Sequence, residues 1–271
     1  MSERRFAIID PAAGVSGDML LGALLAAGAP RDWLEDLPRR LGLDGVTVEV
    51  ADTDRCSIAA VKVTVTLPGG VHEAPHDVVE GPESHGHEHH HHDHGHGGHH
   101  HHHHDHGHAH AGHDHHHGHH HGPHRHVGEL IDIIRRAPLS EWVRQRAIRA
   151  FELLGEAEGR VHGLPPSDVP LHEVGAFDAL VDIVGVVEGF ERLGVTEIAT
   201  RPIAVGHGWV RAAHGVLPVP APATSYLLEG LPIGPDGPVT GEATTPTGAA
   251  LLRVLVTGPV PARWRAVAQG W

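Results

Sequence analysis

Apolar and polar positions along the chain follow several patterns, which together predict both helices and strands. Residues 4–10 form a short apolar run that is typical of a buried strand. Residues 17–28 are rich in Ala and Leu and predict a helix, and residues 31–41 predict a second, short helix. The stretches 46–55 and 57–67 alternate and contain many β-branched residues, so we expect a strand in each of them.

The part of the chain after residue 126 predicts mainly helices, with two further strand regions. Residues 127–136 and 139–161 favour helices, and the second of these is long and amphipathic. Residues 177–194 predict a helix that is buried on nearly all sides, because apolar residues surround most of it. We expect strands within 197–206 and 209–219. Two last helices are expected at 222–229 and directly after the TTPTG stretch at 244–248.

The hydrophobic pattern stops at about Pro68 and resumes near residue 127. The residues between are mainly His, Gly, Asp and Ala, and few large apolar side chains are present to offset the entropy lost on ordering. We therefore expect residues 71–126 to form a disordered His-rich insert. The flanking segments, 1–70 and 127–271, would complete one domain of the α/β class, or alternatively of the α+β class, with a mixed sheet and packed helices.

Composition and charge narrow the range of partners. The chain has 271 residues and a net charge of −14 with neutral histidines, which argues against nucleic acid or an anionic membrane as a partner. Because an unperturbed histidine has a pKa of about 6.5, the 32 histidines could reverse this charge in mild acid. Cys56 is the only cysteine, which excludes an internal disulfide and fits a reducing compartment. We expect a cytoplasmic protein without a signal peptide or membrane span.

The His-rich insert is the strongest chemical signal in the sequence. Neutral imidazole is a good ligand for zinc, nickel and copper(II), whereas the soft ligands that copper(I) prefers are scarce in a chain with one Cys and two Met. The runs of histidine supply many overlapping sites at high local concentration, which suits holding several labile ions. Composition alone does not separate nickel from zinc, and an inert spacer is the alternative interpretation. The candidate ligands are His89, His90, His91, His92, His99, His100, His101, His102, His103, His104, His115, His116, His117, His119, His120 and His121.

A second cluster of acids and histidines lies in the part that is expected to fold. His172 and Glu173 come shortly before Asp178 and Asp182, which are four residues apart and share one helix face. A buried Asp182 needs a cation, a metal or several donors, so these four residues are candidate catalytic groups. The alternatives are that Asp178 complements the helix dipole and that His172 is structural. His207 and His214, each next to a glycine, are further candidate metal ligands that could join this cluster.

Two turns at the starts of helices are candidate anion-binding sites. Ser16, Gly17 and Asp18 follow a predicted strand and begin a helix, and helix N-termini present free N–H groups to anions. Asp10 could help to hold a cation between Asp18 and a bound phosphate. The second turn contains a Pro and several hydroxyls, and simple N-capping is the alternative interpretation for both turns. Its candidate phosphate-binding residues are Thr244, Thr245, Thr247 and Gly248.

Five stretches together resemble the LarC family of nickel insertion proteins. They are DPAAGVSGDMLLGALLAAG, ELLGEAEGRVHG, HEVGAFDALVDIVG, HGVLPVPAPAT and EATTPTGAA, and they lie on both sides of the His-rich insert. The chain departs from the family pattern at Pro170, where a His is common, and at Ala179, where a Ser is common. The family normally continues with a C-terminal domain associated with CTP, and we expect that domain to be absent here.

The resemblance implies a nickel chelatase, or insertase, of the lyase class. Such a protein would insert Ni(II) into pyridinium-3,5-bisthiocarboxylic acid mononucleotide and so form the nickel-pincer cofactor. It further implies a requirement for CTP with Mn(II) or Mg(II), a C-terminal LarC part acting in trans, and an apoenzyme partner such as lactate racemase. Two alternatives remain open from the residues alone: a nickel or zinc storage protein that acts through the His-rich insert, and a metal-dependent phosphate-ester hydrolase.

Overall fold

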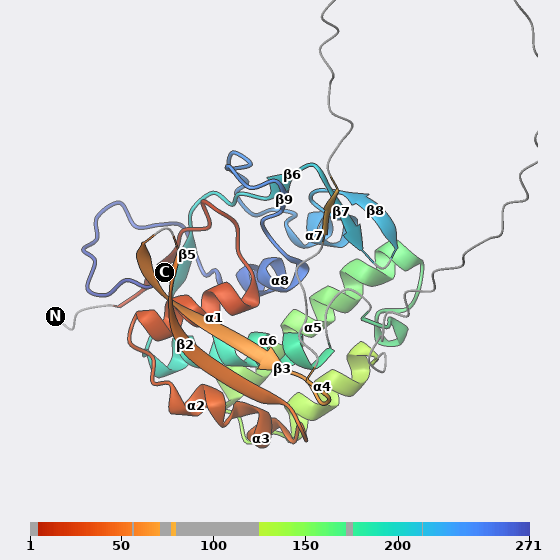
Figure 1. The fold of residues 1–271 in the computed structure, drawn as a ribbon, viewed down its shortest axis with the longest axis horizontal. Helices are drawn as coiled ribbons and strands as arrows, with labels where there is room; N and C mark the ends of the chain where they lie inside the picture. Colours follow the sequence, from red (N-terminus) through yellow and green to blue (C-terminus); the bar gives the residue numbers. More distant parts are fainter. Residues whose placement is uncertain (1–4, 56, 71–76, 80–124, 172–175, 213) are drawn as a thin grey trace, which may run out of the picture. The chain divides into compact units, whose positions relative to one another are not determined.

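The computed structural model describes residues 5–55, 57–70, 77–79, 125–171, 176–212 and 214–271. The described residues before and after the His-rich segment pack together as one compact unit (Figure 1). Most of the expected insert, including the candidate ligands from His89 to His121, lies outside the described residues.

Helices and strands are both present, as the hydrophobic pattern predicts. The helices are α1 (Gly17–Ala26), α2 (Asp32–Glu35), α3 (Leu37–Leu41), α4 (Val127–Arg136), α5 (Glu141–His162), the 3-10 helix η1 (Pro166–Asp168), α6 (Ala176–Arg192), α7 (Pro222–Leu227) and α8 (Pro246–Leu255). The strands are β1 (Ala7–Ile9), β2 (Thr47–Arg55), β3 (Ile58–Thr66), β4 (Asp77–Val79), β5 (Ile198–Thr200), β6 (Gly206–His207), β7 (Trp209–Ala212), β8 (Gly215–Pro218) and β9 (Gly241–Glu242). The mixed class of fold is confirmed.

The strands of the described residues are divided among four small sheets instead of one mixed sheet. β1 pairs with β5 in parallel, while β2 and β3 form a long antiparallel hairpin. β4, β7 and β8 form a three-stranded antiparallel sheet, and β6 pairs with β9. Most of these strands have only two to four residues, so each offers few backbone N–H and C=O groups for pairing with a further strand.

Helix α6 forms the centre of the core. It packs against α1, α3, α5, α8 and β3, and its apolar side chains from Ala179 to Phe190 are almost completely buried. Gly185 and Gly189 allow this close packing, because a Cβ atom at Gly185 would lie 2.9 Å from Leu21 and one at Gly189 would lie 2.9 Å from Leu24. The prediction of a helix buried on nearly all sides is confirmed. None of the described helices combines the length and the apolar character needed to cross a membrane.

A buried ion-pair network fixes the C-terminal half of α6. Glu188 accepts hydrogen bonds from Arg40 of α3 at 2.8 and 3.0 Å, and from Arg192 one turn further along α6 at 2.6 and 3.0 Å. Because the carboxylate is almost inaccessible to water, these charged donors offset its desolvation. The network holds α6 against α3 and so fixes the register of the acidic residues at its other end.

The predicted single helix over residues 31–41 is wrong, because two short helices occupy this segment. α2 ends at Glu35 and α3 begins at Leu37, with Asp36 between them. Pro38 accounts for the break, since its nitrogen has no hydrogen to donate and its ring crowds the carbonyl group four residues earlier.

Three strand expectations and the bounds of the insert also need correction. The strand expected at 209–219 is two strands, β7 and β8, which pair as an antiparallel hairpin. The strand expected at 4–10 is limited to β1 and is half-exposed. The region 197–206 contains only the short β5 and the start of β6, and Pro202, which cannot donate to a ladder, lies between them. Within the expected insert 71–126, β4 pairs with β7, so residues 77–79 belong to a sheet. Alternation over three residues is too short a pattern to have predicted β4.

Candidate functional site

The two predicted anion-binding turns form one continuous structure. The Val15 N–H donates to the Ala243 carbonyl at 3.0 Å, and the Thr245 N–H donates to the Val15 carbonyl at 3.1 Å. Gly248 permits the contact, because a Cβ atom there would lie 2.2 Å from the Val15 carbonyl oxygen. The N-terminus of α8 therefore lies directly against the turn that precedes α1, although more than 200 residues separate the two in sequence.

Asp182 of α6 joins this pair of turns. A Cβ atom at Gly17 would lie 2.2 Å from Asp182 Oδ2, so only a glycine allows the first residue of α1 to approach this carboxylate. Asp182 is 7% exposed, and the positive end of the α1 dipole favours a negative charge beside it. Asp178 lies one turn earlier on α6 and is half-exposed. The structure thus brings together residues 16–18, Asp182 and the turn that begins α8.

The hydroxyl groups of the two turns have different roles. Ser16 occupies the N-cap position of α1, but its side chain makes no capping bond and instead donates to Asp18. Thr245 does cap α8, because its oxygen accepts from the Gly248 N–H at 3.1 Å. Thr244 is fully buried and donates to the Ala204 carbonyl at 2.7 Å. N-capping therefore explains Thr245 but not Ser16, and the first N–H groups of α1 do not donate to the Ser16 hydroxyl oxygen.

Thr247 and Asp10 complete the predicted residues at these turns. Thr247 lies in the first turn of α8 and is largely buried. Asp10 follows β1 and forms an ion pair with Arg201 at 3.1 Å, with both side chains about half-exposed. This guanidinium neutralises the Asp10 charge in the structure, and the expected metal-binding role of Asp10 stays a prediction.

The two histidines that were expected to join one cluster lie in different surroundings. His207 is on β6, where its Nε2 lies 3.5 Å from Thr240 Oγ1 of the segment before β9. His214 directly precedes β8, and its ring packs against His162 at the end of α5, with the ring centroids 4.6 Å apart. Among the residues that the structure describes, no group of three or more His, Cys, Asp or Glu side chains is arranged to hold a metal ion.

Sequence reasoning missed the residues that surround His214. His162 Nε2 lies 3.4 Å from Glu158 Oε2, and both residues belong to the last turns of α5. Their four-residue spacing on an amphipathic helix was a usable signal for a side-chain pair. Their proximity to His214 was not predictable, because it depends on how the β7–β8 hairpin packs.

The predicted catalytic residues His172 and Glu173 lie outside the described residues. The candidate ligands of the tract are outside them as well, so the roles of both groups stay predictions.

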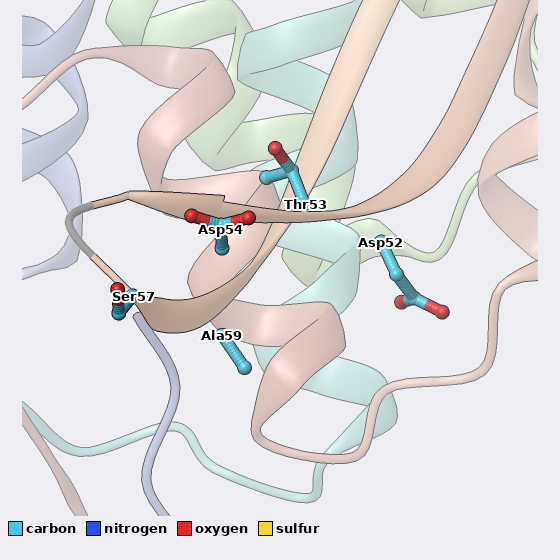
Figure 2. Close-up of a pocket in the computed structure, with 5 residues that line it drawn as sticks. All are labelled: Asp52, Thr53, Asp54, Ser57 and Ala59. Carbon is cyan, nitrogen blue, oxygen red and sulfur yellow. The ribbon is translucent and has the colours of Figure 1, made fainter.

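A surface depression occurs at the turn end of the β2–β3 hairpin (Figure 2). Its lining residues are Asp52, Thr53, Asp54, Ser57 and Ala59. The carboxylate of Asp52 is already paired with Arg31 of the loop before α2. We assign no role to this depression, because two acids on an exposed hairpin are an ordinary solvated surface.

Comparison with known proteins assigns the chain to a family. A family profile described as "Nickel insertion protein" matches residues 7–270. The chain is 36% identical over 259 residues to a pyridinium-3,5-bisthiocarboxylic acid mononucleotide nickel insertion protein of Geobacillus kaustophilus, covering 93% of this chain and 52% of the relative. A protein of the same description from Thermotoga sp. (strain RQ2) is 37% identical, with 93% and 53% covered. A third, from Nocardioides sp., is 37% identical, with 94% and 52% covered.

The chain spans about half the length of the curated relatives that it matches. No solved structure matches it significantly. The profile match covers nearly all of the sequence, including the turns before α1 and α8, helix α6 and the hairpin that carries His214. The chain therefore belongs to the nickel insertion protein family.

Proposed function

We propose that this chain takes part in inserting Ni(II) into pyridinium-3,5-bisthiocarboxylic acid mononucleotide, the precursor of the nickel-pincer cofactor. The observation that carries the proposal is the family match over residues 7–270, together with relatives that are named for this reaction. The nickel ion is a substrate in this proposal. Storage of nickel or zinc and phosphate-ester hydrolysis are less favoured, because neither use is named among these relatives.

The joined turns of α1 and α8 supply a binding site for the phosphate of the mononucleotide. Two helix N-termini meet there, and each offers N–H groups and the positive end of a dipole to an anion. Val15 connects the turns through two backbone hydrogen bonds, so the donors of the two helices keep a fixed spacing. Ser16, Gly17, Thr245, Thr247 and Gly248 are the candidate contacts in this proposal, and the buried Thr244 supports them.

Asp182 and Asp178 have a separate role beside this phosphate site. Both lie on α6, and Asp182 adjoins the first residue of α1. We assign to these carboxylates the binding of the divalent cation that accompanies a nucleotide phosphate, or the transfer of protons during metal insertion. His172 and Glu173, which precede Asp178 by six and five residues in the sequence, are assigned to the same catalytic group.

The chemistry favours transfer of nickel from imidazole to sulfur. The histidine tract collects Ni(II) through many exchangeable imidazoles, and the soft sulfurs of the two thiocarboxylates bind the ion more strongly. A dependence on CTP with Mn(II) or Mg(II), a C-terminal part acting in trans, and delivery to an apoenzyme such as lactate racemase belong to the same proposal. So do the lyase class and the cytoplasmic location.

The test is a reconstituted insertion reaction. The full chain is incubated with Ni(II), CTP, Mg(II) and the metal-free mononucleotide, with and without a separately expressed C-terminal half of a relative. Mass spectrometry of the small-molecule fraction detects the nickel complex. We expect product when both parts are present, and we expect the variant Asp182→Asn to lose most of it, while Asp132→Asn, on the exposed face of α4, keeps it.

Absence of the nickel complex in every arrangement would overturn the proposal. Release of inorganic phosphate from the mononucleotide without nickel insertion would favour the hydrolase instead. Retention of many nickel ions per chain without any product would favour storage.

A further inference from the structure

The end of helix α5 and the β7–β8 hairpin place two imidazoles and a carboxylate together. The side chain of His162 packs on His214, and Glu158 lies beside His162. Glu158 is 6% exposed, whereas His214 is exposed to solvent and His162 is partly so. Exposure to solvent therefore increases from the buried Glu158 through His162 to His214 at the surface.

We propose that His162 and His214 bind one divalent transition-metal ion between their imidazoles, with Glu158 as the residue that positions His162. An imidazole nitrogen binds such an ion at about 2.0–2.1 Å, which places each ring centroid about 3.2 Å from the metal; two rings that meet at about 90–110° then have centroids about 4.5–5.2 Å apart. The observed separation of 4.6 Å falls in this interval, and the planes are tilted by 53°.

Glu158 acts on His162 as a carboxylate typically acts on a metal-binding histidine. Its Oε2 lies 3.4 Å from His162 Nε2, and in the proposal it accepts the proton of that nitrogen, which leaves Nδ1 as the metal ligand. Glu158 is almost completely buried and lies one turn before His162 on α5, so the proposal assigns to it the orientation of the ring. Replacement of such a residue lowers metal affinity without removing a ligand.

The backbone around the pair also favours a cation. His162 is the last residue of α5, a helix of 22 residues whose C-terminus carries the negative end of its dipole. The chain after α5 is fixed, because Gly159 packs against the Leu164 carbonyl and the Leu164 N–H donates back to Gly159 at 3.1 Å. His214 lies in the short connection between β7 and β8, whose four residue pairs hold it in register.

Two protein ligands leave several coordination positions open. Water or an incoming sulfur ligand can occupy them, so an ion at this pair is exchangeable, in contrast to one in a closed structural site. The identification of the ion as nickel on its way to the mononucleotide rests on the proposed function, whereas the existence of the site does not. Imidazole ligands bind both nickel and zinc well. Nickel is the probe used in the test because paramagnetic Ni(II) broadens the signals of the rings that bind it.

The test uses the full-length chain with every histidine from His85 to His121 replaced by serine, so that the tract does not mask the pair. Paramagnetic Ni(II) is added, and the histidine ring resonances are followed by NMR. We expect the signals of His162 and His214 to broaden first, while the signal of His126, whose Nδ1 lies 3.0 Å from the Asp168 carbonyl oxygen, stays sharp. Equilibrium dialysis should show that His162→Gln and His214→Gln each abolish this binding, and that His126→Gln, the matched control, leaves it unchanged.

Glu158→Gln tests the positioning role separately. We expect about tenfold weaker nickel binding with both imidazoles still broadened, which is the range expected for loss of an outer carboxylate. Glu156→Gln, on the exposed side of the same helix, should have no effect on affinity. Thermal unfolding of each metal-free variant shows that the fold is retained.

Unchanged signals of His162 and His214 at nickel concentrations that broaden other histidines would overturn the proposal and identify the ring contact as simple packing. That result leaves the insertion reaction untouched, because the unmodified chain could still form the cofactor. Conversely, a chain that binds nickel at this pair but forms no cofactor would support the site and contradict the proposed function.

Discussion

The two candidate regions of the described structure lie at opposite ends of helices. At the α1 and α8 turns, two helix N-termini converge, and their hydroxyls, glycines and N–H groups lie next to Asp182. At the end of α5, a helix C-terminus carries His162 and Glu158, with His214 packed on the ring. The first arrangement favours an anion and the second favours a cation.

In the proposed function, this difference keeps two ions apart. The divalent cation assigned to Asp178 and Asp182 lies beside the phosphate, whereas nickel is held by imidazoles at the end of α5. Helix direction, which is fixed by chain topology, would then contribute to the selectivity of both regions.

The largest expected effect comes from separating the two turns. In Gly248→Ala the new Cβ would lie 2.2 Å from the Val15 carbonyl oxygen and 3.1 Å from the Ser16 Cα, and the backbone would have to move. Alanine is favoured over glycine in a helix by about 1 kcal/mol, but overpacking of this kind costs up to about 3 kcal/mol, and we expect a net loss of about 2 kcal/mol in the free energy of unfolding. Urea denaturation measures it.

Gly258→Ala is the matched control, because a Cβ atom at Gly258 meets no atom within 4 Å. Its stability should stay within about 0.5 kcal/mol of the unchanged protein. Equal stability of the two variants would mean that the contact between the turns is loose, and the fixed spacing of the helix N-termini would have to be abandoned.

A smaller effect is expected from the charge beside α1. Asp182→Asn keeps the size of the side chain but removes a buried negative charge next to a helix N-terminus, which should lower the free energy of unfolding by about 1–2 kcal/mol. Asp132→Asn removes an exposed acid of α4 that pairs with Arg135, and we expect at most about 0.5 kcal/mol there. Chemical denaturation at low ionic strength compares them. A stabilised Asp182→Asn protein would indicate that the carboxylate is repelled at this position.

The smallest effect comes from the cap of α8. Thr245→Ala removes the bond from the Gly248 N–H, and Ser140→Ala removes the corresponding bond from the Val143 N–H at the start of α5. Each should lower stability by about 1 kcal/mol, since both are side-chain caps. Titration calorimetry with the metal-free mononucleotide should separate them, because only Thr245→Ala alters the anion-binding turns. Equal loss of binding in both variants would point to a general effect of stability.

Long, regular hydrophobic patterns predicted the fold well, and short or interrupted ones did not. The bounds of α4 and the burial of α6 follow from periodic apolar residues that extend over several turns. The segment 31–41 was misjudged because the effect of Pro38 outweighed a helical pattern. β4 was missed because three residues in a polar context acquire strand structure only by pairing with β7.

The candidate site shows the same limit at the level of contacts. Ser16, Asp182 and Thr245 were each recognisable from local chemistry, whereas the backbone bonds that join their segments depend on tertiary packing. His214 was predicted as a metal ligand beside the acids of α6, but its ring packs on His162 instead, and the metal-binding role stays a prediction. A single sequence carries no signal for a pair that is brought together by a helix and a distant hairpin.

The decisive measurement is an NMR titration of the 271-residue chain with the histidines from His85 to His121 replaced by serine, in which the metal-free mononucleotide and Ni(II) are added separately. We expect two distinct sets of changes: the mononucleotide shifts the backbone amides of residues 16–18 and 245–248, and nickel broadens the ring signals of His162 and His214. Changes by both ligands in the same residues, or an unperturbed pair of helix N-termini at saturating mononucleotide, would contradict this expectation.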